Sequence, residues 1–72
     1  MIERDVFAAN VRRLREERGW TQEDLAGASG LHLDHVGKIE NCRREPKVGT
    51  ICKLAKGFGV TAGPLFDGID SD

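Results

Sequence analysis

The spacing of two small residues, Ala26 and Gly30, most constrains how this chain of 72 residues can fold. Ala26 has almost no side chain, so a neighbouring helix can approach its backbone closely. Gly30 can adopt a positive φ angle at no steric cost, as a sharp turn between two helices requires. The corner is then filled by three apolar residues, Leu31, Val36 and Ile39. The segment therefore predicts two short helices that cross steeply.

The rest of the chain also has helical periodicity, and no useful length alternates with the period of two that a strand shows. Helices are expected at residues 4–18, 22–28, 32–41 and 48–57, followed by a short last helix that Thr61 caps. Thr21 and Asp24 resemble a capping box at the start of the second helix. The expected core consists of Phe7, Val11, Leu14, Leu25, Ala26, Ala28, Val36, Ile39, Val48, Ile51, Leu54, Ala55 and Phe58. The chain is therefore predicted to be all-α.

Charge is unevenly distributed along the chain. The net charge is −1, and removing the three aspartates of the last six residues (Asp67, Asp70 and Asp72) leaves +2. Between positions 38 and 56 there are two acids and six bases, which are Lys38, Arg43, Arg44, Lys47, Lys53 and Lys56. Such a local basic patch is typical of nucleic-acid binding, although an ordinary solvated face can have the same composition. We expect one domain over residues 1–66 and a frayed acidic tail over residues 67–72.

Two short helices joined at about 90–120° by a turn with Gly form a helix-turn-helix, whose second helix can enter the DNA major groove. The pattern Gln22-x-x-x-Ala26-x-x-x-Gly30-Leu31-x-x-x-x-Val36-x-x-Ile39-Glu40 resembles the Cro and phage-repressor family. "VRRLREERGWTQEDLA" and "TICKLAKGFGV" extend the resemblance to about 60 residues, and the size is similar to controller proteins of restriction–modification systems. The resemblance implies a five-helix, lambda-repressor-like fold and a DNA-binding transcriptional regulator that acts as a homodimer.

The resemblance also implies roles for individual residues. Gln22 matches a residue that contacts a phosphate and braces the second helix of the motif. Arg15 and Glu40 match an ion pair between the first helix and the end of the third, while Ala26 and Gly30 hold the motif's geometry. Contacts with the DNA backbone are implied in the loop after the third helix, at Arg43, Arg44 and Lys47.

Base reading is expected from the exposed face of the third helix, at Leu33, Asp34, His35, Gly37 and Lys38. Leu33 can contact a thymine methyl, and Lys38 can donate to guanine O6 and N7. His35 can donate or accept, and its charge depends on pH near its ordinary pKa of about 6.5. Asp34 can accept from cytosine N4 but repels phosphates, so it is the weakest of the five predictions. Family members often have Arg, Gln, Ser or Thr at the first two positions.

The two cysteines do not indicate a disulfide framework or a metal site. Cys42 is expected to be a partly exposed loop thiol and Cys52 a small core residue, and His32 and His35 add no metal-ligand spacing to them. Cys42 stands where the family usually has Gly, so either Cys42 or Asn41 must take a left-handed backbone conformation. No apolar run approaches the roughly 18 residues of a membrane span, and "MIERDVFAAN" has no signal-peptide core. We expect a cytoplasmic protein without a cofactor, metal or small-molecule ligand.

The dimer surface is expected in the region of the fourth and fifth helices, around Val60, Leu65, Phe66 and Ile69, although Leu65 and Phe66 can instead complete the core. An alternative is a protein-interaction module, such as an antitoxin or accessory subunit, because Leu33, Asp34 and the acidic tail are unusual for a DNA reader. An enzyme is not expected. Asp34 and His35 are neighbours on a helix and point about 100° apart, so they do not form a catalytic pair.

Overall fold

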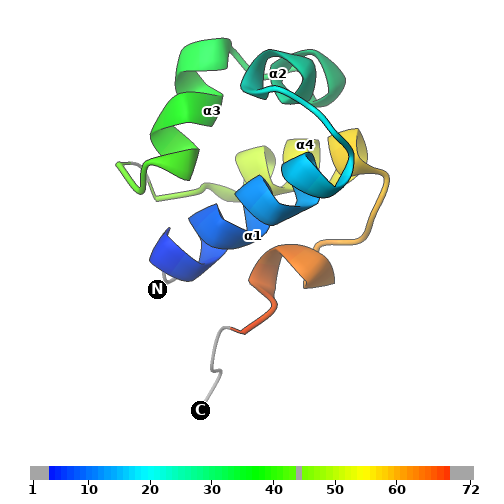
Figure 1. The fold of residues 1–72 in the computed structure, drawn as a ribbon. Coiled ribbons are helices and arrows are strands. Elements are labelled where there is room, and N and C mark those ends of the chain that lie inside the picture. The colour runs from blue at the N-terminus through cyan, green and yellow to red at the C-terminus, as the bar shows by residue number, and fades with distance from the viewer. Residues whose placement is uncertain (1–3, 44, 69–72) are drawn as a thin grey trace.

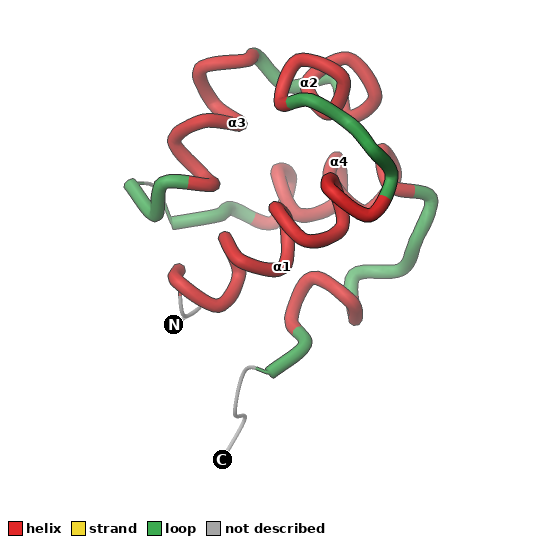
Figure 2. Tube along the Cα trace, viewed as in Figure 1, coloured by secondary structure: helices red, strands yellow, loops and turns green. Residues whose placement is uncertain are grey.

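The computed structural model describes residues 4–43 and 45–68 and contains four α-helices and one 3₁₀-helix in this part of the chain (Figure 1). In chain order the elements are α1 (Arg4–Glu17), α2 (Gln22–Ser29), α3 (Leu33–Glu40), α4 (Val48–Phe58) and η1 (Gly63–Phe66). Loops connect them, and the described residues include no strand (Figure 2). The all-α prediction is therefore confirmed, with a 3₁₀-helix as the fifth element.

The start and end of α2 follow from its own sequence. The Thr21 hydroxyl accepts a hydrogen bond from the Asp24 amide at 3.0 Å, and the Asp24 carboxylate accepts one from the Thr21 amide at 2.9 Å. This is the capping box, which satisfies two amide groups that the helix leaves without partners. Gly30 ends α2 with φ of 75°, and its amide and that of Leu31 both donate to the Ala26 carbonyl. The local prediction for this turn is confirmed.

The last element differs from the prediction. Thr61 does not cap it: Ala62 occupies the N-cap position and makes no side-chain cap hydrogen bond. Pro64 in the first turn has no amide to donate, and the Leu65 amide bonds to the Ala62 carbonyl three residues back at 3.0 Å. Asp67 then turns to an extended conformation, with φ of −57° and ψ of 130°. This bond over three residues closes the short segment as a 3₁₀-helix.

The helices enclose one apolar core. α1 contacts α3, α4 and η1, and α2 contacts both α3 and α4, with η1 on the side of α1 away from α2 (Figure 1). The core cluster consists of Phe7, Val11, Leu14, Leu25, Ala26, Val36, Ile39, Ile51, Leu54, Ala55, Phe58 and Leu65. In the part of the chain that the structure describes, no helix combines the length and apolar character that crossing a bilayer needs.

Three expectations about burial were wrong: Val48 is 77% exposed, and Cys52 and Ala28 are also exposed. Leu65, which was expected either in the core or on the dimer surface, is fully buried. Counted at about 100° per residue, Cys52 lies outside the apolar stripe of α4 and Val48 lies at its edge. Ala28 faces away from the core because Ser29 takes the inward position and donates its hydroxyl to the Leu25 carbonyl at 2.7 Å.

The burial of Leu65 removes it from any surface on which two chains could associate. Its backbone carbonyl also accepts a hydrogen bond from the buried Asn10 side chain at 3.0 Å. Phe66 is half-buried, with its ring 5.6 Å from that of Phe7 between centroids, and Val60 is also half-buried. Ile69, the other residue of the expected dimer surface, lies outside the described residues, as do Asp70 and Asp72 of the expected tail.

A tight contact between α2 and α4 yields a stability prediction. A Cβ atom at Gly57 would lie 2.9 Å from the Ser29 Cα and 3.0 Å from its backbone nitrogen. The neighbour is backbone and cannot rotate away, so Gly57→Ala is expected to destabilise the fold by about 1–3 kcal/mol. Gly27→Ala is the matched control, because a Cβ there meets nothing within 4 Å. It should raise stability by up to about 1 kcal/mol. Urea denaturation measures both, and equal effects would contradict the close approach.

Candidate nucleic-acid interface

The end of α3 is held by a buried carboxylate, Glu40, whose side chain is fully inaccessible to solvent. Arg15 of α1 binds it with two nitrogens: Nε lies 2.7 Å from Oε2, and Nη2 lies 3.0 Å from Oε1. The third nitrogen, Nη1, donates to the Trp20 carbonyl at 2.8 Å. A planar guanidinium suits this two-point contact, which fixes both the distance and the orientation of the two helices.

Two further side chains join this pair. Gln22 Nε2, at the start of α2, donates to Glu40 Oε1 at 3.2 Å. Arg12 Nε lies 3.6 Å from the same oxygen, and Arg12 Nη2 donates to the Glu40 backbone carbonyl at 3.5 Å. Sequence reasoning missed Arg12. Its position three residues before Arg15 puts both on one face of α1, which is the signal that could have found it.

The charge state of Glu40 follows from these contacts. Burial raises the pKa of its carboxyl group. The hydrogen bonds from Arg15 and Gln22 and the charges of Arg15 and Arg12 lower it more, so the pKa lies below its ordinary value. The hydrogen bond that Arg15 donates to Glu40 raises the pKa of Arg15 in turn, against the smaller effect of its burial. Both groups are therefore ionised at neutral pH.

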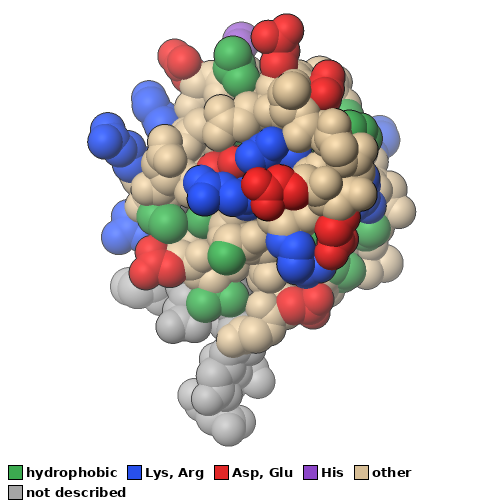
Figure 3. All heavy atoms as spheres, in the orientation of Figure 1, with side chains coloured by type: hydrophobic (Ala, Val, Ile, Leu, Met, Phe, Trp, Pro, Cys, Tyr) green, Lys and Arg blue, Asp and Glu red, His purple; other side chains and the backbone are tan. Residues whose placement is uncertain are grey.

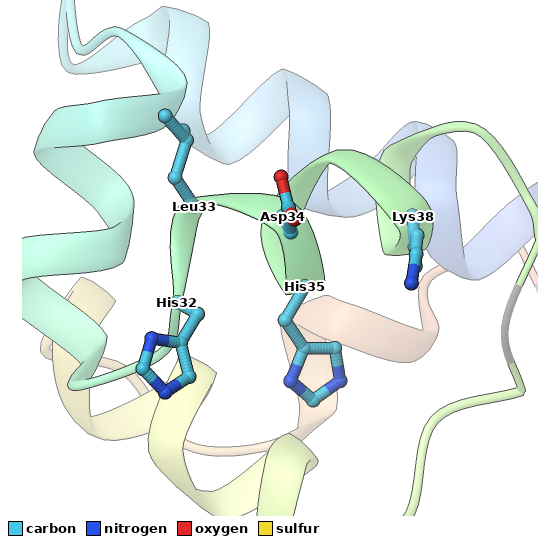
Figure 4. Close-up of a pocket in the computed structure, with 5 residues that line it drawn as sticks. All are labelled: His32, Leu33, Asp34, His35 and Lys38. Atoms are coloured by element: carbon cyan, nitrogen blue, oxygen red, sulfur yellow. The ribbon is translucent and has the colours of Figure 1, made fainter.

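The exposed side of α3 carries most of the side chains that were expected to read bases. A shallow hollow on this side is lined by His32, Leu33, Asp34, His35 and Lys38 (Figure 4). Leu33 is 47% exposed, and Asp34 and Lys38 are also exposed. Gly37 is half-buried instead, and its Cβ position would face Gln22 Oε1 at 3.9 Å. The structure thus brings four of the five predicted residues together and adds His32.

The two histidines point away from Asp34, toward the first turns of α4 (Figure 4). There they line a second hollow together with Gly30, Leu31, Lys47, Gly49, Thr50 and Lys53. Lys47 is the N-cap residue of α4 and makes no side-chain cap hydrogen bond. Lys53 was not predicted as a site residue, and only its place in the basic patch could have indicated it.

The loop after α3 continues the basic surface. In Figure 3, Lys and Arg side chains gather at the left edge, over the end of α3 and this loop, whereas acidic side chains lie over α2 at the top right. Arg43 is exposed, and Arg44 lies outside the described residues. Cys42 takes the left-handed conformation, with φ of 61°, whereas Asn41 has φ of −93°. The expected partly exposed thiol at Cys42 is present, and a hydrogen bond with Asp5 raises its pKa.

Comparison with known proteins identifies the class of this interface. The sequence model of the helix-turn-helix family, of the Cro/C1 type, matches residues 11–65. The chain belongs to this family. Its members are DNA-binding, non-enzymatic transcriptional regulators, so α2 and α3 form the helix-turn-helix that binds DNA. The predicted family resemblance is confirmed.

Relatives of this regulator share its sequence over most of its length. It is 38% identical over 58 residues to the uncharacterised regulator y4dJ of Sinorhizobium fredii, which covers 81% of this chain and 75% of that protein. It is 34% identical over 62 residues to the control protein C.SmaI of Serratia marcescens, covering 86% of this chain and 74% of that one. The regulator DdrOP3 of Deinococcus deserti is 33% identical over 60 residues, but the chain spans only 46% of its length.

Solved structures show the same fold. The restriction–modification controller protein C.AhdI of Aeromonas hydrophila superposes with a TM-score of 0.84 at 35% identity, covering 88% of this chain and 96% of that one. The hypothetical transcription factor NHTF from Neisseria superposes with a TM-score of 0.82 at 38% identity, covering 88% of this chain and 72% of that one. These regulators share the arrangement of α2 and α3.

Removing Arg15 from its buried ion pair with Glu40 tests how much this pair contributes to the stability of the fold. Arg15→Met leaves the Glu40 carboxylate buried without its main partner and is expected to destabilise the fold by about 3–5 kcal/mol. Arg13→Met removes two exposed pairs, in which Nη1 lies 3.2 Å from Glu17 Oε2 and Nη2 lies 3.5 Å from Asp67 Oδ2, and should cost less than about 1 kcal/mol. The free energy of unfolding in urea measures both. A similar small loss for the two variants would show that burial does not strengthen the Glu40 contact.

The lowered pKa of Glu40 predicts how stability depends on pH. As pH falls, Glu40 in the unfolded chain takes up a proton at a higher pH than Glu40 in the folded chain does. This contribution to stability is therefore complete above the ordinary glutamate pKa of about 4.3 and is lost as pH falls toward the lowered value in the fold. The stability difference between wild type and Glu40→Gln should shrink over that acidic range. The control is Glu17→Gln, at an exposed position, whose difference should change much less. A constant difference for Glu40→Gln would contradict the prediction.

Proposed function

We propose that the chain is a sequence-specific transcriptional regulator that binds a near-palindromic operator as a homodimer, with α3 in the major groove. The observation that carries this proposal is the division of α3 into two faces. Val36, Ile39 and Glu40 are buried and fix the helix to the core, while Leu33 and Lys38 are exposed. A helix held this rigidly can present its outer side chains to base edges in a defined geometry.

Contacts with phosphates position the protein in this proposal. Gln22 is the first residue of α2, where unpaired backbone amides favour an anion, and its side chain also reaches Glu40 at the end of α3. Arg43, Arg44 and Lys47 in the loop after α3 contact the adjacent backbone. Such contacts carry little sequence information but make affinity depend steeply on salt.

The dimer surface is assigned to the end of α4 and η1, around the half-buried Val60 and Phe66, with Ile69 beyond the described residues. Two copies joined there by a twofold axis would place their α3 helices about one turn of DNA apart, roughly 34 Å. One chain has a net charge of −1, so its basic patch alone attracts DNA weakly. Dimerisation brings two such patches to the same DNA. In this proposal residues 1–66 form the DNA-binding domain, and residues 67–72 form an acidic tail.

A salt titration tests the proposal directly. Binding of the protein to a fluorescent duplex of random sequence is measured by anisotropy at increasing salt. We expect weak binding at low salt that falls steeply as phosphates regain their counterions. Undetectable binding at low salt would overturn the proposal and favour a protein-interaction module. Sedimentation of the protein with an operator selected from a random pool then distinguishes one bound chain from two.

Lys38→Ala tests whether α3 reads bases. On the selected operator we expect a loss of about 1–3 kcal/mol in binding free energy, because an amino group that donates to guanine is removed. Lys56→Ala is the control, since it removes the same charge from an exposed position of α4 away from α3. Its loss should be smaller and equal on operator and random duplex. An equal loss for Lys38→Ala on the two duplexes would show that Lys38 contacts only the DNA backbone.

A further inference from the structure

Asp34 and Lys38 carry opposite charges on α3 but do not form an ion pair with each other. They lie four residues apart, on the same side of the helix in Figure 4. On α1 the same spacing closes into an ion pair between Arg13 and Glu17 at 3.2 Å. Within residues 4–43 and 45–68, no ion pair or side-chain hydrogen bond is formed by Asp34 or Lys38. Both groups are exposed and free to contact a ligand.

The hydrogen-bonding chemistry of a carboxylate narrows what Asp34 can face in a major groove. A carboxylate only accepts hydrogen bonds. Guanine presents two acceptors there, and thymine presents an acceptor and a methyl group. Neither base can donate a hydrogen bond to Asp34, and their acceptors repel its carboxylate. Adenine presents an amino group beside the N7 acceptor, whereas cytosine presents its N4 amino group alone. Cytosine therefore suits Asp34 best, because its N4 amino group has an acceptor on one side only, the O6 of the paired guanine, whereas adenine N6 lies between its own N7 and the O4 of the paired thymine.

Lys38 and Leu33 are exposed near Asp34 and favour other bases. The Lys38 ammonium group only donates hydrogen bonds, so guanine, with O6 and N7, suits it best. Residues four apart on a helix are separated by about 6 Å along its axis, which corresponds to roughly two base-pair steps. Leu33 has no polar atom in its side chain, and the thymine methyl is the apolar group that the groove offers it.

We propose that Asp34 is a specificity residue that selects a cytosine in each half-site, within about two base pairs of a guanine contacted by Lys38. Asp34 acts largely by exclusion, because guanine and thymine offer its carboxylate no donor and the adenine amino group lies between two acceptors. Lys38 offsets the repulsion between this carboxylate and the nearby phosphates. This inference rests on the proposed function and names the DNA sequence class that the same face reads.

Selection from a random duplex pool tests the inference with three forms of the protein. The wild type should enrich a motif with a cytosine and a guanine within about two base pairs. Asp34→Asn has the same shape, but its amide pairs with adenine N6 and N7, so the cytosine should be replaced by adenine while the guanine stays. Glu16→Gln makes the same charge change on an exposed part of α1 and should keep the wild-type motif.

A base analogue isolates the contact itself. The selected cytosine is replaced by 2-pyrimidinone, which lacks the N4 amino group. Wild-type affinity should then fall roughly 5- to 10-fold, and the affinity of Asp34→Ala should not change. Circular dichroism and binding to random duplex at low salt verify that each variant is folded and retains its phosphate contacts.

The outcomes separate this inference from the proposed function. A selected motif without the cytosine, or a motif that Asp34→Asn leaves unchanged, overturns the role of Asp34 while operator binding stands. Equal loss of affinity on the analogue for wild type and Asp34→Ala also overturns it. Absence of any enriched sequence, together with undetectable binding to random duplex at low salt, overturns both. A shift from cytosine to adenine that is specific to Asp34→Asn supports the inference.

Discussion

The contact on which the DNA-binding geometry depends is the buried pair between Arg15 and Glu40. This pair joins the last residue of α3 to the last turn of α1, and Gln22 connects the same carboxylate to the start of α2. Three helices therefore meet at one side chain. Buried ion pairs add little to stability against a well-packed apolar alternative, but they require one arrangement of their partners. Here that arrangement sets the angle of α3 against α1 and α2, and in the proposed function the angle at which α3 meets DNA.

The parts of the fold that could be predicted from sequence are those determined by neighbours in the chain. The capping box at Thr21 and the left-handed turn at Gly30 depend on a few consecutive residues, and both were predicted correctly. Errors arose where tertiary packing decides. Val48, at the edge of the apolar stripe of α4, is left exposed by the way α4 packs against α2 and α1. The choice between core and dimer surface at Leu65 is decided by η1, which folds back onto α1 and buries it. A single sequence contains no direct record of these contacts.

For the candidate site the same distinction applies. The pairing of Arg15 with Glu40 was implied by family resemblance, since the two residues are 25 positions apart and share no local pattern. Arg12 and Lys53 were missed because their relevance depends on which helix faces they share with distant residues. The exposure of Leu33 and Asp34 could be predicted, because the apolar spacing of Val36 and Ile39 determines which side of α3 turns outward.

The close contact between Gly57 and Ser29 acts as a steric stop between α2, the first helix of the helix-turn-helix, and α4, which leads into the region proposed for dimerisation. α2 rests against α4 there without an intervening side chain, so the distance between them has little freedom to vary. In the proposed dimer, two such stops lie in series between one α3 and the other. The proposed dimer then holds its two α3 helices at one preferred separation. In the proposed dimer, an operator whose half-sites are moved by one base pair, about 3.4 Å along and 34–36° around the DNA axis, would fit only if the DNA or the dimer deformed.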